Sequence, residues 1–115
     1  MSFYNERIKE RIMIKLLLLL LVIFMNPTFA GDPAAGESKF KSNCKQCHGP
    51  AGMGMASYPK VSGNPVDYTR NRLQTYRSGA EIGPNSALMI MMAKPLTDEE
   101  IENLSAYLKD AKNGN

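Results

Sequence analysis

The chain has 115 residues, a length that suits one small domain, and 43% of them are hydrophobic. Most of its formal net charge of +3 arises in the first thirty residues, where four basic and two acidic side chains leave a surplus of two. The rest of the chain is therefore nearly neutral, which excludes a nucleic-acid-binding protein that acts through a strongly basic surface. Its apolar side chains alone would make a thin core, so we expect a bound group or a crosslink.

The first thirty residues are typical of an export signal. An unbroken apolar run from Leu16 to Met25 is shorter than the ~20 residues that cross a bilayer, but it suits the hydrophobic region of a signal peptide. Asn26-Pro27 ends the run, and Thr28-Phe29-Ala30 places small residues three and one before a cut. We expect cleavage after Ala30, a mature domain of residues 31–115 and a periplasmic location. An uncleaved leader that tethers the domain to the membrane, facing the periplasm, is the alternative, and a start at Met13 would give an equally good signal.

Two cap signals predict the first and last helices of the mature domain. Asp32-Pro33 offers an acceptor side chain at the cap and a proline in the first turn, and predicts a helix that ends near Asn43. Thr97-Asp98-Glu99-Glu100 is a capping box that opens the last helix. The apolar residues that follow at helical spacing are Ile101, Leu104, Leu108 and Ala111, with Tyr107 beside this stripe.

One further helix is predicted in the middle of the domain, between two irregular segments. Gly49 to Gly63 is rich in Gly, Pro, Met and Ser and has no helical or strand period, so it predicts a loop wrapped around something. Asn64-Pro65 repeats the cap-then-proline signal, and the helix that it opens would close at Ser78-Gly79. Pro84 to Ala93 is a methionine-rich stretch. Because no alternating strand pattern occurs, we expect an all-helical domain with long loops.

Cys44-Lys45-Gln46-Cys47-His48 carries the chemistry. Two thiols at this spacing can each form a thioether with a haem vinyl group, while the adjacent imidazole reaches the iron. A thioredoxin-like dithiol has the same spacing, but it accompanies a strand-helix-strand pattern that this sequence lacks. A structural zinc site needs four ligands, and the chain has no further Cys or His. A simple disulfide would leave His48 unexplained.

A haem iron with one histidine ligand has a second axial position to fill. Three methionines follow the middle helix, namely Met89, Met91 and Met92. A thioether ligand raises the reduction potential of the iron and suits electron carriage. Only one of the three sulfur atoms can bind, so the other two methionines would fill gaps around the haem. The chemistry of the residues leaves the choice among the three open.

Together these residues resemble those of the bacterial class I cytochromes c, in particular the small periplasmic single-haem members and the haem domains of their two-domain relatives. The resemblance covers residues 31–115. It rests on five segments in the family's order: Gly31 to Gly36, Cys44 to Gly49, Tyr58 to Gly63, Tyr76 to Gly79 and Met92 to Ile101. It implies an all-α fold, with three to five helices and long loops around one covalently bound haem c.

The resemblance also implies roles for single residues at the haem. Counting back eight residues from Thr97 identifies Met89 as the axial ligand opposite His48, although the additional Met91 departs from the family pattern. The backbone carbonyl of Pro59 would accept the other ring proton of His48 and so make it a better ligand.

In the fold, the resemblance implies that the first and last helices cross. Gly36 would let Tyr107 pack closely against the first helix, and Phe40 and Leu104 would support the same contact.

With both axial positions filled by side chains, the iron has no open site for a substrate, so the sequence predicts an electron carrier and not an enzyme. We expect a monomer that shuttles electrons between respiratory dehydrogenase, oxidase or reductase complexes and meets the membrane only through them. A haem-based sensor or gas-binding cytochrome with a displaceable Met89 is the alternative. Lys45, inside the haem motif, and Lys94, after the methionines, are candidate docking residues. Ordinary solvated charge explains these two lysines almost equally well.

Overall fold

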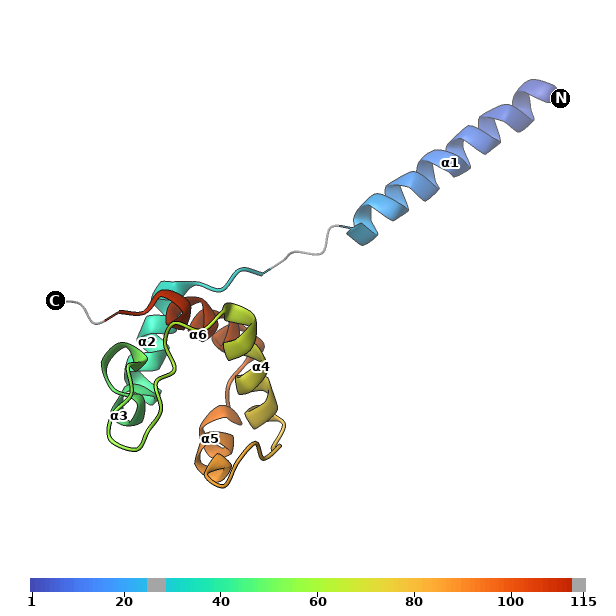
Figure 1. Ribbon diagram of the computed structural model, residues 1–115. Helices are drawn as coiled ribbons and strands as arrows, with labels where there is room; N and C mark the ends of the chain where they lie inside the picture. The colour runs from blue at the N-terminus through green and yellow to red at the C-terminus, as the bar shows by residue number, and fades with distance from the viewer. Residues whose placement is uncertain (25–28, 113–115) are drawn as a thin grey trace.

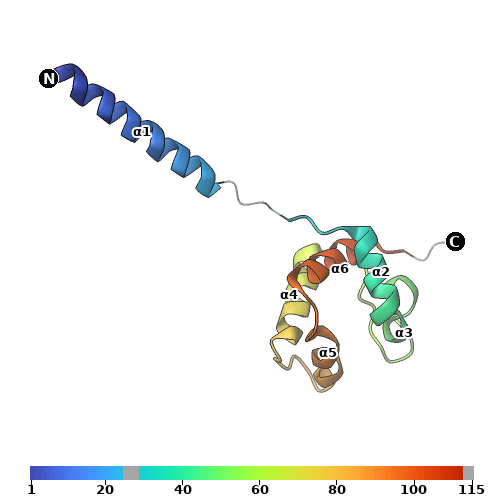
Figure 2. The same ribbon diagram turned by 180° about the vertical axis from the view of Figure 1, so that it is seen from behind.

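The computed structural model describes residues 1–24 and 29–112. In these two ranges the chain forms helices and no β-strand, apart from an isolated antiparallel bridge between Met55 and Tyr58. Helix α1 spans Ser2–Phe24 and stands apart from the other helices in both views (Figures 1 and 2). No helix in the described ranges is long and apolar enough to cross a membrane. The end of the expected leader, from Met25 to Thr28, lies outside the described residues.

Helix α6 is the element on which the two halves of the domain meet. The domain that follows α1 contains α2 (Pro33–Asn43), α3 (Lys45–His48), a 3₁₀ turn η1 (Pro50–Gly52), α4 (Val66–Arg77), α5 (Ser86–Ala93) and α6 (Asp98–Asp110). Helix α6 packs against both α2 and α4, and α4 packs against α5. Both views show an arch, in which α2 and α3 form one arm, α4 and α5 form the other, and α6 joins them (Figures 1 and 2). The all-helical prediction is confirmed.

A glycine lets α2 and α6 approach closely. A Cβ atom on Gly36 would lie 1.9 Å from the carbonyl oxygen of Asn103 and 2.9 Å from Cβ of Tyr107, so no larger residue fits there. Beside this crossing the rings of Phe40 and Tyr107 lie 5.6 Å apart and tilted at 47°. Phe40 and Leu104 are both buried at the centre of the core. The predicted close packing of these helices is confirmed.

The segment before α2 also packs against α6. The backbone N–H of Asp32 donates to Oδ1 of the buried Asn103 at 2.7 Å, while the Asp32 carboxylate caps α2 by accepting from the N–H of Ala34 at 2.9 Å. A Cβ atom on Gly31 would lie 2.1 Å from the carbonyl oxygen of Glu102. The chain from Gly31 onward therefore belongs to the folded domain.

The capping box at the start of α6 is confirmed. The N–H of Glu100 donates to Oγ1 of Thr97 at 3.1 Å, and the N–H of Thr97 donates to Oε2 of Glu100 at 2.9 Å. From α2, Nζ of Lys39 lies 2.8 Å from the other carboxylate oxygen of Glu100. The ammonium of Lys39, and after it the N–H of Thr97, lower the pKa of Glu100.

The start of α4 corrects one prediction. Asn64 does not cap this helix, because its Nδ2 donates instead to the carbonyl of Val61 at 3.3 Å. Pro65 occupies the cap position and no side chain caps the helix, which begins at Val66. The predicted end is confirmed, since Arg77 is the last helical residue and is followed by Ser78 and by Gly79 with φ of +87°.

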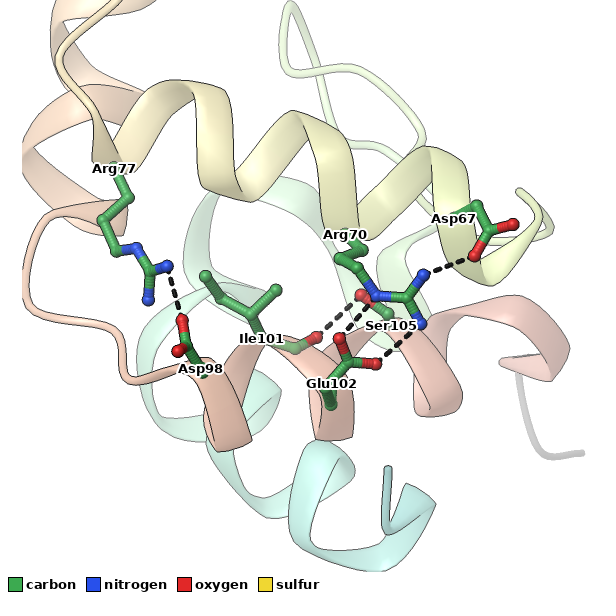
Figure 3. Close-up of polar contacts among 7 residues, drawn as sticks. All are labelled: Asp67, Arg70, Arg77, Asp98, Ile101, Glu102 and Ser105. Atoms are coloured by element: carbon green, nitrogen blue, oxygen red, sulfur yellow. Dashed lines mark hydrogen bonds and ion pairs between the residues drawn. The ribbon is translucent and has the colours of Figure 1, made fainter. Parts of the chain in front are cut away.

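Two arginines of α4 bind carboxylates of α6 (Figure 3). Arg70 donates from Nε to Oε1 of Glu102 at 2.5 Å and from Nη2 to Oε2 at 2.8 Å. Arg77, two turns further along α4, donates to Oδ1 of Asp98 at 2.6 Å. Because the two pairs are separated along both helices, they fix the direction of α4 as well as its distance from α6.

Candidate haem-binding site

The five-residue cysteine and histidine motif forms the junction between α2 and α3. Cys44 ends α2 and is the cap residue of α3, and its carbonyl accepts from the N–H groups of Cys47 and His48 at 3.2 and 2.9 Å. Residues three and four apart share one face of a helix, so this single turn brings the three predicted haem residues together. Both thiols are unpaired. Burial raises the pKa of Cys44 to about 11, so this thiol stays protonated at neutral pH.

The imidazole of His48 is fixed by a backbone carbonyl. Nδ1 lies 2.8 Å from the oxygen of Pro59, and the side chain is 8% exposed. A carbonyl can only accept, so Nδ1 carries the proton and the neutral ring keeps its lone pair on Nε2. The ring of Tyr58 stands edge-on to the imidazole at 6.4 Å. The chain therefore leaves Nε2 with a free lone pair and holds the ring that carries it.

Glycines after the motif fold the loop back onto it. Gly49 has φ of +76°, and a Cβ atom there would lie 2.8 Å from the carbonyl oxygen of Gly54. Gly54 in turn donates its N–H to the carbonyl of His48 at 2.7 Å. This reversal of the chain carries Pro59 to the imidazole. The predicted wrapped loop is confirmed, and its inner side contacts His48.

The three candidate methionines lie on α5, in the other arm of the arch. The start of α5 is held by Ser86, whose Oγ accepts from the N–H groups of Ile82 and Gly83, both at 2.8 Å. Ser86 and Ala93 are buried and lie seven residues apart, so they mark the packed side of the helix. The structure thus places the motif and the methionines on opposite arms, joined through α6 (Figures 1 and 2).

The helical phase separates the three methionines. Met89 is three residues after Ser86 and flanks the packed side, and it is only partly exposed. Met91 points away from that side and is 61% exposed, and Met92, which is 36% exposed, lies between them.

Both arms carry exposed apolar side chains, which fit a large planar apolar group. In residues 31–112, the large hydrophobic side chains with the highest exposure are Met53, Met55, Tyr58, Tyr68, Ile82, Leu88, Met91 and Met92. Most of these belong to the loop after α3 or to α5. In the described residues no group of three or more His, Cys, Asp and Glu could hold a metal by itself. Two thiols, one imidazole Nε2 and apolar surroundings instead suit an iron that is already bound in a macrocycle such as haem.

The fold and the motif define a c-type haem protein, and the chain belongs to the cytochrome c family, whose model, "Cytochrome c", matches residues 33–112. It is 44% identical over 79 residues to cytochrome c-554(548) of Halomonas halodenitrificans, covering 68% of this chain and 94% of that protein. It is 34% identical over 97 residues to the thiosulfate dehydrogenase electron acceptor of Thiomonas intermedia, covering 81% of this chain and 43% of that protein.

Its fold is similar to the crystal structure of reduced cytochrome c4 from Pseudomonas stutzeri, with a TM-score of 0.60 and 28% identity, over 71% of this chain and 50% of the other. The chain therefore has the class I cytochrome c fold and carries one covalently bound haem c through the Cys44, Cys47 and His48 motif. Membership of this family implies electron transfer.

Proposed function

We propose that this chain is a periplasmic carrier of single electrons whose haem iron is bound by His48 and Met89. The contact that carries the proposal is the 2.8 Å distance between His48 Nδ1 and the Pro59 carbonyl, since it leaves Nε2 as a fixed and electron-rich ligand atom. The haem supplies an iron that changes between the ferrous and ferric states. A second ligand from the chain closes the iron to substrates, which suits a carrier and not an enzyme.

Met89 is proposed as the second ligand because a ligand atom must be held in place. It flanks the buried side of α5, whose first turn is anchored by the two hydrogen bonds to Ser86. Met91 is 61% exposed and turned away from that side, so its sulfur has the least support from the fold. The register of the family, counted back from Thr97, identifies the same residue.

We further propose that residues 1–30 are an export signal removed after Ala30, leaving a monomeric domain of residues 31–115 in the periplasm. The apolar run of the leader supports export, and the seating of Gly31 on α6 supports a domain that begins there. A leader that stays attached and tethers the domain to the membrane is the alternative arrangement.

The proposed partners are a dehydrogenase as the electron donor and a respiratory oxidase or reductase as the acceptor. The first part rests on the relative whose name describes it as a thiosulfate dehydrogenase electron acceptor. Lys45 and Lys94 are proposed to attract an acidic partner, because both are exposed and neither forms an ion pair in the part of the chain that the structure describes. They would raise the association rate and its salt dependence more than the affinity.

The ligand assignment is tested by three single variants of the haem-loaded protein, Met89→Ala, Met91→Ala and Met92→Ala. We expect Met89→Ala alone to abolish the absorption band for charge transfer between sulfur and iron and to lower the reduction potential. The other two variants serve as matched controls on the same helix and keep both features. Loss of the band in Met91→Ala or Met92→Ala would move the ligand to that residue. Rapid binding of carbon monoxide by the unaltered ferrous protein would favour the gas-binding alternative.

A further inference from the structure

A small hollow lies where the end of α6 meets the loop after the haem motif. Its volume is about 240 Å³, and it is lined by Met53, Lys60, Ser62, Gly63 and residues 109–112. A hydrogen bond of 2.8 Å from the N–H of Gly63 to the carbonyl of Leu108 joins its two walls. Because this bond joins the loop to the end of α6, the lining side chains from the two segments stay next to each other.

Positive charge exceeds negative charge in this hollow. Three of its lining residues are lysines, Lys60, Lys109 and Lys112, and one is an acid, Asp110. Asp110 lies next to Lys109, with 3.6 Å between Nζ and Oδ2. Lys60 and Lys112 form no ion pair within the described ranges, so the hollow keeps a surplus of two positive charges.

A second hollow, between α2 and α6, gives a useful contrast. It is lined by Lys39 and Glu100 together with small polar residues. There the ammonium of Lys39 lies 2.8 Å from the Glu100 carboxylate, so the two charges already satisfy each other. An excess of cations is thus a property of the hollow at the end of α6 and not of every surface depression in this domain.

A buried hydroxyl group gives the hollow a hydrogen-bond donor in addition to its positive charges. Ser62 lines the hollow and is 4% exposed, and its Oγ donates only to the thioether of Met53, at 3.4 Å. A thioether sulfur is a weak acceptor. A negatively charged oxygen would accept a shorter and stronger hydrogen bond from the same hydroxyl.

We propose that this hollow binds a small divalent oxyanion of the sulfate or phosphate class, held by Lys60, Lys109, Lys112 and the hydroxyl of Ser62. Such an anion matches the surplus of two positive charges, and its oxygens can accept from several donors at once. Lys60 directly follows Pro59, whose carbonyl holds His48. A bound anion would therefore add negative charge to the loop that holds His48, which would stabilise a ferric haem iron and lower its reduction potential.

Binding is tested by titration calorimetry of the haem-loaded protein with sodium sulfate and with sodium phosphate, against sodium chloride at the same ionic strength. We expect saturable binding of either divalent anion with one site per chain, and no saturation with chloride. The reduction potential should fall along the same titration curve. Equal responses to all three salts would mean general screening of surface charge and would overturn the proposal.

Four variants locate the site. Lys109→Gln/Lys112→Gln should weaken binding about tenfold or more, whereas Lys41→Gln/Arg72→Gln removes the same charge elsewhere and should leave it within about twofold. Asp110→Asn should tighten binding because it removes the repelling carboxylate. Ser62→Ala changes no charge but should weaken binding and reduce the preference for sulfate over chloride. Equal weakening by the two lysine and arginine pairs, or an unchanged affinity in both Asp110→Asn and Ser62→Ala, would contradict a built site.

Discussion

The guanidinium of Arg70 on α4 holds both carboxylate oxygens of Glu102 on α6 (Figure 3). The two residues are 32 positions apart in the sequence, and Arg70 also donates to Asp67 on its own helix. Since α4 packs on α5, the Arg70–Glu102 ion pair helps to set the position of the arm formed by α4 and α5 relative to α6. It therefore helps to position the helix that carries Met89, the proposed second ligand.

Replacing Arg70 by Ala should loosen that arm. We expect a loss of about 1 kcal/mol in the free energy of unfolding, because the pair is bidentate but remains partly open to water. Urea unfolding measures the loss. The control is Lys41→Ala, which breaks the exposed Lys41–Glu37 pair within α2 and should change stability little. Equal stability of Arg70→Ala and the unaltered protein would show that packing alone positions α4.

A methyl group at Gly36 should force α2 and α6 apart. The added carbon would overlap the Asn103 carbonyl, and overpacking of a core contact costs about 2–3 kcal/mol. Thermal unfolding of Gly36→Ala should show the loss as a lower Tm. Gly83→Ala is the matched control, since nothing lies within 4 Å of its added carbon. A Gly36→Ala protein with the unaltered Tm would mean that the helices can shift without cost.

Substituting Thr69 with Val should stabilise the domain. Oγ1 of Thr69 is the one buried side-chain polar atom without a hydrogen-bond partner in residues 1–24 and 29–112. Leaving such a group unsatisfied costs about 1–3 kcal/mol, so its removal should raise the free energy of unfolding by about 1 kcal/mol. Thr75→Val is the control, because Oγ1 of Thr75 donates to the carbonyl of Asn71 at 2.7 Å. A gain of the same size in both variants would point to a general effect of replacing a hydroxyl by a methyl group and away from the orphaned hydroxyl.

Acid should weaken the contact between α2 and α6 through Glu100. Its pKa is lowered in the folded state by Lys39 and by the N–H of Thr97, so its stabilising effect is complete above the ordinary pKa of 4.5. The effect is lost as the pH falls from there through the lower folded value. Glu100→Gln should therefore flatten stability against pH below about 4.5. The neighbouring Glu99→Gln should keep the acid loss, and an identical loss in Glu100→Gln would contradict this assignment.

The features that the sequence predicted are those whose partners lie close along the chain. The capping box joins Thr97 to Glu100 across three positions, and the haem motif is five consecutive residues, so both are legible in the sequence. Helix α5 was not predicted, because nearly every residue from Ser86 to Ala93 is apolar and no helical period stands out. Its anchor, Ser86, is a single polar residue before this apolar run, and its bonds to the N–H groups of Ile82 and Gly83 belong to no sequence motif used above.

Contacts between residues far apart in the sequence could not be predicted from the sequence pattern. In the sequence, Glu102 is only one acidic residue near the start of a helix. Its ion pair with Arg70 could be identified only from the structure. The same holds for Gly31, whose close approach to α6 depends on a carbonyl 71 residues away. The predicted cap at Asn64 was wrong for a different and local reason, because its amide donates to the carbonyl of Val61, three residues earlier. Pro59 was assigned to His48 by the family resemblance, since nothing in their spacing requires the contact.

The position of α6 at the end of the chain also sets the timing of folding. Helices α2 and α4 are made first, yet each has its main packing surface on the last helix. Until Asp98 to Asp110 has emerged, the earlier helices have no partner against which to bury their apolar sides, and short isolated helices are marginal in water. Under the proposed export, the domain would thus stay unfolded during its passage and would become compact only after Asp98 to Asp110 has arrived on the far side.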